Sequence, residues 1–433
     1  MRSCKALLEA LQSGACDQAL STLYALDGTQ TSLDKARSRA CHVVQSFIDT
    51  FHPAEGAHAA LFSGPGRTEI GGNHTDHQHG RVLCGSVDLD MLACAAPNGE
   101  NVIRVRSEGY PALEIGLDRL EVREEEKNTS AALVRGVAAR VKELGFALSG
   151  FDAYAVSTVL SGSGLSSSAA YEVLIGNILN YFCCGGKLDA VTIAKIGQYA
   201  ENVYFGKPCG LMDQMGSSVG GVVSIDFADP AAPVIETVDF DLSAAGHALC
   251  IIDSGADHAD LTDEYAAVPN ELREICSHFG KTVLREIPEE DFFAALPALR
   301  GKYGDRAVLR AVHIYADNRR VSEQLSALRG GEFDRFLSLV NASGLSSWRY
   351  LQNIVPAGYT RHQEMAVALA VAERTLGGAG ACRVHGGGFA GTIQAFVPLE
   401  LVDSFKAEIE RVLGEGKCHV LHIRPQGGCV VAG

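Results

Sequence analysis

Residues 161–170, with the sequence SGSGLSSSAA, constrain the fold of this chain more than any other stretch. The preceding residues 154–160 are β-branched and apolar, which predicts a buried strand. Apolar side chains then recur at helical spacing from Tyr171 to Phe182, which predicts an amphipathic helix. A glycine- and serine-rich loop between a strand and a helix N-terminus favours an anion such as phosphate, because it presents backbone amides and a positive dipole end. The loop matches neither GxxxxGKS/T nor GxGxxG, so a plain helix cap is an equal alternative at this point.

Composition limits what the chain binds. Its 433 residues are enough for two or three domains, and 47% hydrophobic with 21% charged residues is typical of a soluble globular protein. The net charge of −15 is unfavourable for binding nucleic acid or an anionic membrane. We therefore expect small-molecule partners, no nucleic acid, no membrane, and a monomer or weak homo-oligomer.

The cysteines and the N-terminus indicate the compartment. The 13 cysteines show no CxxC pair and no Cys/His zinc spacing, so they predict reduced, buried thiols. Charged residues interrupt every apolar run near the N-terminus, and no stretch of 18 apolar residues occurs. Neither a signal peptide nor a membrane-spanning helix is therefore expected, which predicts a cytoplasmic protein.

The hydrophobic pattern predicts a mixed α/β (α+β) chain. Helices are expected within 1–52 and at 131–144, 191–204, 264–279, 305–328 and 360–376, and strands at 59–62, 87–95, 101–106, 112–116, 219–226, 249–253, 381–385, 392–397 and 419–424. The pattern changes near residue 227, which predicts an N-terminal domain over 31–226 and a C-terminal domain over 227–433. Residues 1–30 form a helical extension that we expect to serve packing or self-association rather than catalysis.

The stretch 67–79 places an arginine, two carboxylates and three histidines in a glycine-rich turn directly after a strand. Such polar density is poor core material, because each buried polar group needs a partner. A solvated loop with chance histidines is the plain alternative. The spacing of His74, His77 and His79 matches no standard metal-ligand geometry, so a metal site is not favoured.

A second polar stretch places Glu201 at a helix end and Asp213 in a loop over 206–215. A carboxylate in a tight Pro/Gly loop is often only a turn former. Combined with Arg67 and a phosphate loop, however, Asp213 fits a general base, and Glu201 with a loop serine fits a Mg²⁺ site. A third glycine-rich stretch, 382–391, lies between two apolar strands and is uninformative alone.

Taken in this order, the stretches resemble the motifs of the GHMP small-molecule kinases, and within them the galactokinases. The family's first motif, GRxNLIGEHTDY, is matched at Gly66, Arg67, Gly72, His74, Thr75 and Asp76. Its phosphate loop, PxGxGLSSSA, is matched at Gly162, Ser163, Gly164, Leu165, Ser166, Ser167, Ser168 and Ala169. Its PCGxMDQ segment is matched in full by residues 208–214, and its third motif, GARMTGGGFGG, is matched at Gly380, Ala381, Arg383, Gly386, Gly387, Gly388, Phe389 and Gly391. His258 and Tyr265 fall where galactokinases carry a histidine and a sugar-contacting tyrosine.

The resemblance implies a two-domain GHMP kinase fold with ATP as phosphoryl donor and the active site in the cleft between the domains. It implies that the ATP phosphates lie on residues 162–168, and that Ser168 (or Ser167) and Glu201 hold Mg²⁺. Asp213 would accept the proton of the sugar's anomeric hydroxyl, and Arg67 would keep Asp213 ionised. The implied sugar contacts are Arg67, Asn73, His74, Asp76, Gly210, Asp213 and Tyr265.

Departures from the family motifs concern mainly the sugar. They lie at Glu69, Gly71, Asn73, His77, His385 and Ala390, and Pro269 interrupts a predicted helix. The family carries a glutamate at the position of Asn73, where it accepts a hydrogen bond from the sugar's 6-hydroxyl, so the neutral Asn73 predicts looser recognition there. Phosphorylation of galactose to galactose 1-phosphate is the first expectation. A kinase for a pentose or a 6-modified hexose, and a non-catalytic sugar and ATP sensor, are the alternatives.

Overall fold

The computed structural model describes residues 2–26, 29–159, 164–207, 209–256 and 261–433. Helices and strands are mixed along the chain, which confirms the predicted class. The α-helices are α1 (Cys4–Gln12), α2 (Asp17–Tyr24), α3 (Gln30–Phe51), α4 (Ser130–Glu143), α5 (Ser167–Cys183), α6 (Ala190–Tyr199), α7 (Met212–Val219), α8 (Thr262–His278), α9 (Glu289–Ala294), α10 (Leu296–Tyr303), α11 (Asp305–Arg329), α12 (Phe333–Ser346), α13 (Glu364–Leu376) and α14 (Val402–Leu413). The strands are β1 (Arg2–Ser3), β2 (His58–Gly71), β3 (Arg81–Pro97), β4 (Val102–Ser107), β5 (Leu113–Gly116), β6 (Phe151–Ser157), β7 (Val222–Asp226), β8 (Val234–Val238), β9 (His247–Asp253), β10 (Ala381–Val384), β11 (Thr392–Pro398), β12 (Cys418–Leu421) and β13 (Cys429–Ala432).

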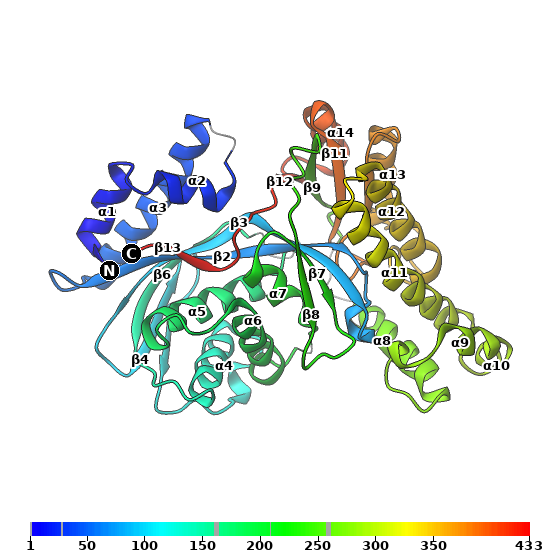
Figure 1. Ribbon diagram of the computed structural model, residues 1–433, viewed down its shortest axis with the longest axis horizontal. Helices are drawn as coiled ribbons and strands as arrows, with labels where there is room; N and C mark the ends of the chain where they lie inside the picture. Colours follow the sequence, from blue (N-terminus) through cyan, green and yellow to red (C-terminus); the bar gives the residue numbers. More distant parts are fainter. Residues whose placement is uncertain (1, 27–28, 160–163, 208, 257–260) are drawn as a thin grey trace.

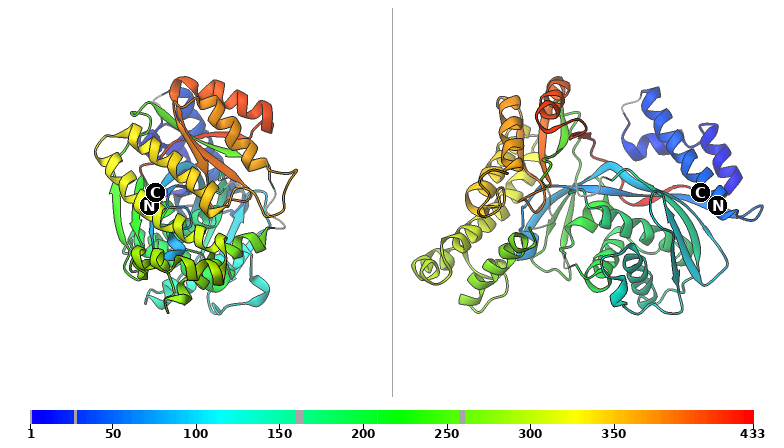
Figure 2. Two further views of the ribbon diagram at one scale, coloured as in Figure 1. Left: turned by 90° about the vertical axis from the view of Figure 1, so that its right-hand side faces the viewer. Right: turned by 180° about the vertical axis from the view of Figure 1, so that it is seen from behind.

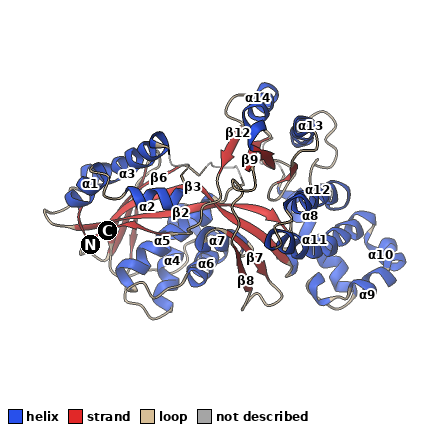
Figure 3. Ribbon diagram, turned by 45° about the horizontal axis from the view of Figure 1, so that its top comes forward, coloured by secondary structure: helices blue, strands red, loops and turns tan. Residues whose placement is uncertain are grey.

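The larger sheet is built on two long neighbouring strands, β2 and β3, and has nine strands within the described residues. Its main path is β1-β2-β3-β6-β4-β5, while β13 joins β2, β7 joins β3 and β8 joins β7. One end of β3 pairs with β6 and the other end pairs with β7. The long strands therefore cross the molecule and connect its two halves (Figures 1 and 3).

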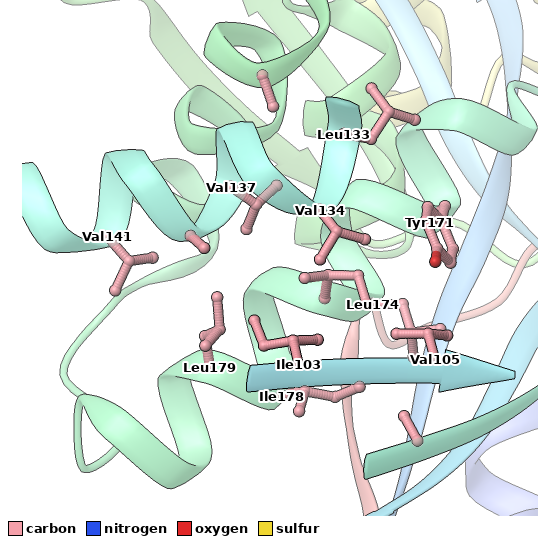
Figure 4. Packing of buried hydrophobic residues seen from close by; sticks show 14 of the residues in the cluster. Ile103, Val105, Leu133, Val134, Val137, Val141, Tyr171, Leu174, Ile178 and Leu179 are labelled. Carbon is pink, nitrogen blue, oxygen red and sulfur yellow. The ribbon is translucent and has the colours of Figure 1, made fainter. Parts of the chain in front are cut away.

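Both faces of this sheet are covered by helices. Along β2, Ala60 and Phe62 pack towards α4 and α5, while Ala59 and Leu61 pack towards α1, α2 and α3. This alternation follows from the two-residue period of a strand, and burial on both faces explains why residues 59–62 are all apolar. Figure 4 shows the core between α4, α5 and β4, and Figure 1 shows the N-terminal helices on the opposite side.

The C-terminal half contains an antiparallel four-stranded sheet with the order β10-β11-β9-β12. Cys250 and Ile252 of β9 contact α13 and α14, whereas Leu249 and Ile251 belong to the core shared with α12. Helices α8 to α11 pack around a separate apolar cluster and project from this half of the molecule (Figure 2).

Three elements differ from the prediction in ways that matter for the site. The strand expected at 59–62 continues through two register shifts as β2, so Arg67 lies on a strand rather than in a turn. Asp213, expected in a loop, lies in the first turn of α7. The helix expected over 191–204 is α-helical only to Tyr199 and continues as a π-helix over Ala200–Phe205, a form that is frequent at functional sites. These features depend on tertiary pairing and packing, which no local pattern encodes.

The sequence pattern also missed α9, α10, α12, α14, β8 and β13. The domain division at residue 227 stays a prediction, although β8 and β13 follow it in the chain and belong to the larger sheet. In the described part of the chain, no helix has the length and apolar character needed to cross a membrane.

Candidate active site

The described end of the predicted phosphate loop leads directly into α5. Gly164 and Ser166 both have positive φ angles, 72° and 56°, so the backbone turns sharply before the helix. Leu165 is buried, and its carbonyl accepts a hydrogen bond of 3.0 Å from the Arg67 amide. Ser166 makes no side-chain capping bond to α5, which suits the helix N-terminus to an anion. Gly162 and Ser163, predicted ATP contacts, lie outside the described residues.

Arg67 and Asp213, which are distant in sequence, form an ion pair beside this loop. Arg67 Nε donates to Asp213 Oδ1 over 2.8 Å, and Nη2 lies 2.6 Å from the same oxygen. Arg67 Nη1 donates to the Gly164 carbonyl, so the guanidinium links the carboxylate to the loop. Asp213 keeps 24% of its side chain exposed and is therefore accessible to a ligand.

Arg67 also controls the ionisation of Asp213. Burial by itself raises the pKa of the Asp213 carboxyl, but the positive charge and hydrogen bond of Arg67 outweigh burial. The hydroxyl of Ser166 adds a further hydrogen bond. The net effect holds the pKa of Asp213 below its usual value, so the carboxylate is ionised at neutral pH.

Glu201 lies in the π-helical turn with only 1% of its side chain exposed. Ser168 Oγ donates to Glu201 Oε1 over 3.0 Å, and Gln214 Nε2 donates to Glu201 Oε2 over 2.8 Å. Lys207 Nζ lies 3.5 Å from Oε1. A hydroxyl and a carboxylate held together in this way fit a hard cation that takes its other ligands from phosphate and water. Among the described residues, no group of three His, Cys, Asp or Glu side chains is placed to hold a metal ion by itself.

The end of the first motif forms a polar wall. His74 Nε2 donates to the Gly387 carbonyl over 3.0 Å, and burial lowers the pKa of His74 to about 4, so the ring is neutral at pH 7. The Asp76 carboxylate lies against Gly210, where any side chain would collide with it. Asp76 thus contacts the segment that carries Asp213, at Gly210, and His74 contacts the third motif, at Gly387.

Asn73 does not occupy the predicted position. It has no exposed surface, and its Nδ2 donates to Glu69 Oε1 over 3.0 Å and to the Gly386 carbonyl over 2.6 Å. Its Oδ1 accepts hydrogen bonds from Ser347 and Asn353. The amide is fully used by these bonds within the protein, so this geometry does not support the predicted contact of Asn73 with the sugar's 6-hydroxyl. The physical reason is the carboxylate of Glu69, which draws the amide into the interior.

Tyr265 of α8 reaches the third motif. Its hydroxyl donates to the Gly388 carbonyl over 2.7 Å, and its ring lies edge-on to Phe389. A side chain at Gly387 would meet the Tyr265 ring at 2.8 Å, so this approach requires glycine. Burial raises the pKa of Tyr265 to about 12, which keeps the hydroxyl protonated. The predicted partner His258 lies outside the described residues.

His385 is a site residue whose role the sequence did not indicate. It is buried behind the phosphate loop, where a side chain at Gly164 would lie 3.0 Å from Nδ1. Its Nε2 accepts a hydrogen bond of 3.2 Å from the Glu69 amide, and its Nδ1 lies 3.0 Å from Thr392 Oγ1. Burial, with the nearby charges of Arg67 and Arg383, holds the pKa of His385 well below its usual value. The only sequence signal was its departure from the family's threonine.

Two further features also lacked a local signal. Glu172 is buried on α5 and accepts a hydrogen bond of 2.9 Å from Gln214, the residue that also contacts Glu201.

A cavity of about 460 Å³ opens beside Ser167 and Ser168. Its other lining residues include Met91, Tyr110, Leu133, Val159, Tyr171 and Phe205, which come from six separate segments. A partly apolar cavity next to a phosphate loop suits the base of a nucleotide.

Two family descriptions match the chain. The GHMP kinases N terminal domain matches residues 132–221, which include the phosphate loop, Glu201 and Asp213. The galactokinase galactose-binding signature matches residues 45–97, which include Arg67, His74 and Asp76. The two matches therefore include Arg67, Asp213 and Glu201 but not Tyr265 or the 386–388 turn.

The chain is also similar to individual known proteins, in sequence and in structure. A galactokinase of Streptomyces coelicolor is 29% identical over 350 residues, which cover 81% of this chain and 87% of that protein. The structure of Lactococcus lactis galactokinase complexed with galactose has a TM-score of 0.75 at 24% identity and covers 89% of this chain and 97% of its own. Methanococcus jannaschii mevalonate kinase has a TM-score of 0.60 at 14% identity and covers 86% of this chain and 99% of its own.

The sequence motifs, the family matches, the fold and the arrangement of the site all indicate the same family. The two solved structures share their fold with this chain. The match to the galactose-binding signature favours similarity to the galactokinase rather than to the mevalonate kinase. The chain is accordingly similar to the GHMP kinases and, among them, to the galactokinases.

Proposed function

We propose that this protein is a sugar kinase that transfers the γ-phosphoryl group of ATP to the anomeric hydroxyl of galactose. The observation that carries the proposal is the accessible Arg67–Asp213 pair beside the N-terminus of α5, within reach of the stretch that carries the galactose-binding signature. A buried basic residue, an ionised carboxylate and a phosphate-binding helix are the parts that phosphoryl transfer to a hydroxyl requires. We further propose a monomer or weak homo-oligomer that acts in the cytoplasm.

Asp213 acts as the general base. Its Oδ1 is bound to Arg67, and the exposed part of the carboxylate accepts the proton of the sugar's anomeric hydroxyl as the new P–O bond forms. The lowered pKa of Asp213 keeps the base ionised, and the protonated acid forms only as the oxygen gains its phosphoryl group.

Arg67 has two tasks that follow from its contacts. It keeps Asp213 ionised and in place, and its bond to the Gly164 carbonyl aligns the base with the loop on which the phosphates lie. Its positive charge also stabilises negative charge on the transferring phosphoryl group, which is the main source of catalysis in such reactions.

The described part of the phosphate loop offers three serine hydroxyls, those of Ser166, Ser167 and Ser168. Ser168 with Glu201 is the pair that would hold Mg²⁺, since their oxygens are 3.0 Å apart. When bound, Mg²⁺ would neutralise part of the negative charge of the phosphates. Lys207, 3.5 Å from Glu201, supplies a positive charge at the same position.

The sugar lies between the first and third motifs in this proposal. His74, Asp76 and Gly210 form one wall, and Tyr265 with the 386–388 turn forms another. Nδ1 of neutral His74 and the carboxylates of Asp76 and Asp213 offer acceptors for the hydroxyl groups of the sugar.

A coupled assay of ADP release tests the proposal across galactose, 6-deoxygalactose, arabinose, galacturonate and glucose. We expect Mg²⁺-dependent turnover that is fastest with galactose and absent in Asp213→Ala. Turnover with another sugar of the panel but not with galactose would assign a different substrate. Binding of ATP and sugar without turnover would indicate the sensor function instead.

A further inference from the structure

The N-terminal extension contacts a buried cluster of charges behind the phosphate loop. Asp90 of β3 has no exposed surface and lies between Arg39 of α3 and Arg424, which follows β12. Arg39 Nη1 lies 2.5 Å from Asp90 Oδ1, and Arg424 Nη1 lies 3.2 Å from Oδ2. Two guanidinium groups on one carboxylate fix its position, because a buried charge is stable only when its partners are held in place.

Tyr24, the last residue of α2, completes this cluster. Its side chain is buried, and its hydroxyl donates to Asp90 Oδ2 over 2.9 Å. The same hydroxyl accepts a hydrogen bond of 3.3 Å from Arg39, and the Arg424 guanidinium lies 5.9 Å from the ring centre. The extension therefore reaches a charged group in the kinase core, in addition to packing Leu7, Leu11, Leu20 and Leu23 against the sheet.

Asp90 is bonded in turn to the segment that leads to the phosphate loop. The Thr158 amide and hydroxyl both donate to the Asp90 carbonyl, over 2.9 and 3.1 Å, and Thr158 Oγ1 lies 3.0 Å from the Asp90 amide. Arg39 Nη2 also donates to the carbonyls of Asp90 and Val156. Val159 then packs in one apolar cluster with Leu165, whose carbonyl is bonded to Arg67. These contacts join Tyr24 to the loop without passing through the substrate site.

We propose that Tyr24 is a positioning residue for nucleotide binding, and that the N-terminal extension sets the phosphate loop through the contacts from Tyr24 to Asp90 and from Asp90 to Thr158. This goes beyond the expectation that residues 1–30 serve packing or self-association alone. The inference rests on the proposed function in one respect, namely that the loop over 162–168 holds the phosphates of ATP.

Titration calorimetry with ADP and with a non-hydrolysable ATP analogue tests the inference on the full chain. Tyr24→Phe keeps the ring and removes only the hydroxyl, so we expect a folded protein whose nucleotide Kd and KM for ATP rise about threefold to tenfold. The KM for the sugar should stay at the wild-type value. Leu20→Ala is the matched control: it removes packing in the same helix, so it should lower Tm while the nucleotide Kd stays unchanged.

Thr158→Val tests the other end of the same path. It should raise the nucleotide Kd to a similar extent, and the double variant with Tyr24→Phe should be less than additive, since both remove one connection. If Tyr24→Phe does not fold, Thr158→Val alone decides, because it keeps the bond between Tyr24 and Asp90. If Thr158→Val or folded Tyr24→Phe binds nucleotide with wild-type affinity, the inference about Tyr24 is overturned and the proposed function is not affected. A wild-type protein that binds no nucleotide overturns the proposed function together with the inference.

Discussion

Arg67 and Glu69 lie two positions apart on β2, and each forms an ion pair with a distant residue. The two ion pairs differ in their exposure to solvent. Arg67 pairs with Asp213, whose side chain is 24% exposed. Glu69 pairs with Arg383, and these side chains are 5% and 0% exposed. The first pair has a carboxylate that a substrate can reach, whereas the second is sealed inside the protein.

The partners of the two carboxylates explain the difference. Asp213 is held by Arg67 and Ser166 on one side and open on the other. Glu69 accepts hydrogen bonds from both Arg383 and Asn73 on Oε1, and its side chain is only 5% exposed. The same pair of residue types therefore serves chemistry in one place and stability in the other. The following predictions test this division, from the largest expected effect to the smallest.

Replacing the accessible carboxylate should slow turnover strongly and leave the fold intact. Asp213→Asn keeps the shape but not the charge, and the loss of a general base lowers kcat roughly 10³-fold, about 4 kcal/mol in the barrier. Steady-state ADP release with galactose gives kcat, and thermal unfolding monitors the fold. Glu69→Gln is the matched control on the sealed pair. A Glu69→Gln variant that loses as much kcat as Asp213→Asn, with unchanged Tm, would remove the distinction.

Breaking the sealed pair should cost stability instead. Arg383→Met leaves the Glu69 carboxylate buried without its counter-charge, which destabilises a protein by about 3–5 kcal/mol. Denaturant unfolding should therefore show a lower midpoint for Arg383→Met than for the wild type. Arg383→Met combined with Glu69→Leu removes both charges and should recover much of the loss. No recovery in the double variant would mean that the pair is not the source of the effect.

Restoring the family's glutamate at position 73 should harm this chain. Asn73→Glu places a second carboxylate beside Glu69 in a buried site, and we expect a loss of about 2–4 kcal/mol in unfolding free energy. The exchange Glu69→Asn with Asn73→Glu reproduces the family order, so it should be more stable than Asn73→Glu alone. The ratio of kcat/KM for galactose and 6-deoxygalactose should rise only in the exchange variant. An Asn73→Glu protein of wild-type stability would contradict the buried network.

The smallest effect concerns pH. Because Arg67 lowers the pKa of Asp213 against the opposing effect of burial, Arg67→Gln should raise that pKa. The ionised form is the active base, so the acidic fall of kcat should move to higher pH in Arg67→Gln. The same sign applies to stability: the ion pair stabilises the native state above the unfolded-state pKa of aspartate and is lost as pH falls. An acidic limb at the same pH in both proteins would show that Arg67 does not set this pKa.

The sequence predicted those parts of the site that depend on short, contiguous motifs. Arg67, Asp213, Ser168 and Glu201 were assigned from such motifs, and the structure brings them together in two hydrogen-bonded pairs. Their assigned roles stay predictions. The pairs were accessible to sequence reasoning because the chemistry of phosphoryl transfer demands particular residue types in particular loops.

The rest depends on contacts between distant segments. Asn73 is turned inwards by Glu69 and by donors that lie 274 and 280 positions away, so its family position alone was misleading. The π-helical turn that carries Glu201 and the helix that begins beside Asp213 are likewise products of packing. Tyr24 lies in a segment without a counterpart in the family motifs, and only the fold places it on Asp90.

Phosphorus-31 NMR of the product formed from ATP and galactose tests the central claim most directly. The claim is that the accessible Asp213 removes the proton of the anomeric hydroxyl, so the wild type should form a sugar phosphate esterified at the anomeric carbon. Asp213→Asn should form this product roughly 10³-fold more slowly while still binding galactose and nucleotide. A phosphate on another hydroxyl of the sugar, or undiminished product from Asp213→Asn, would contradict the account.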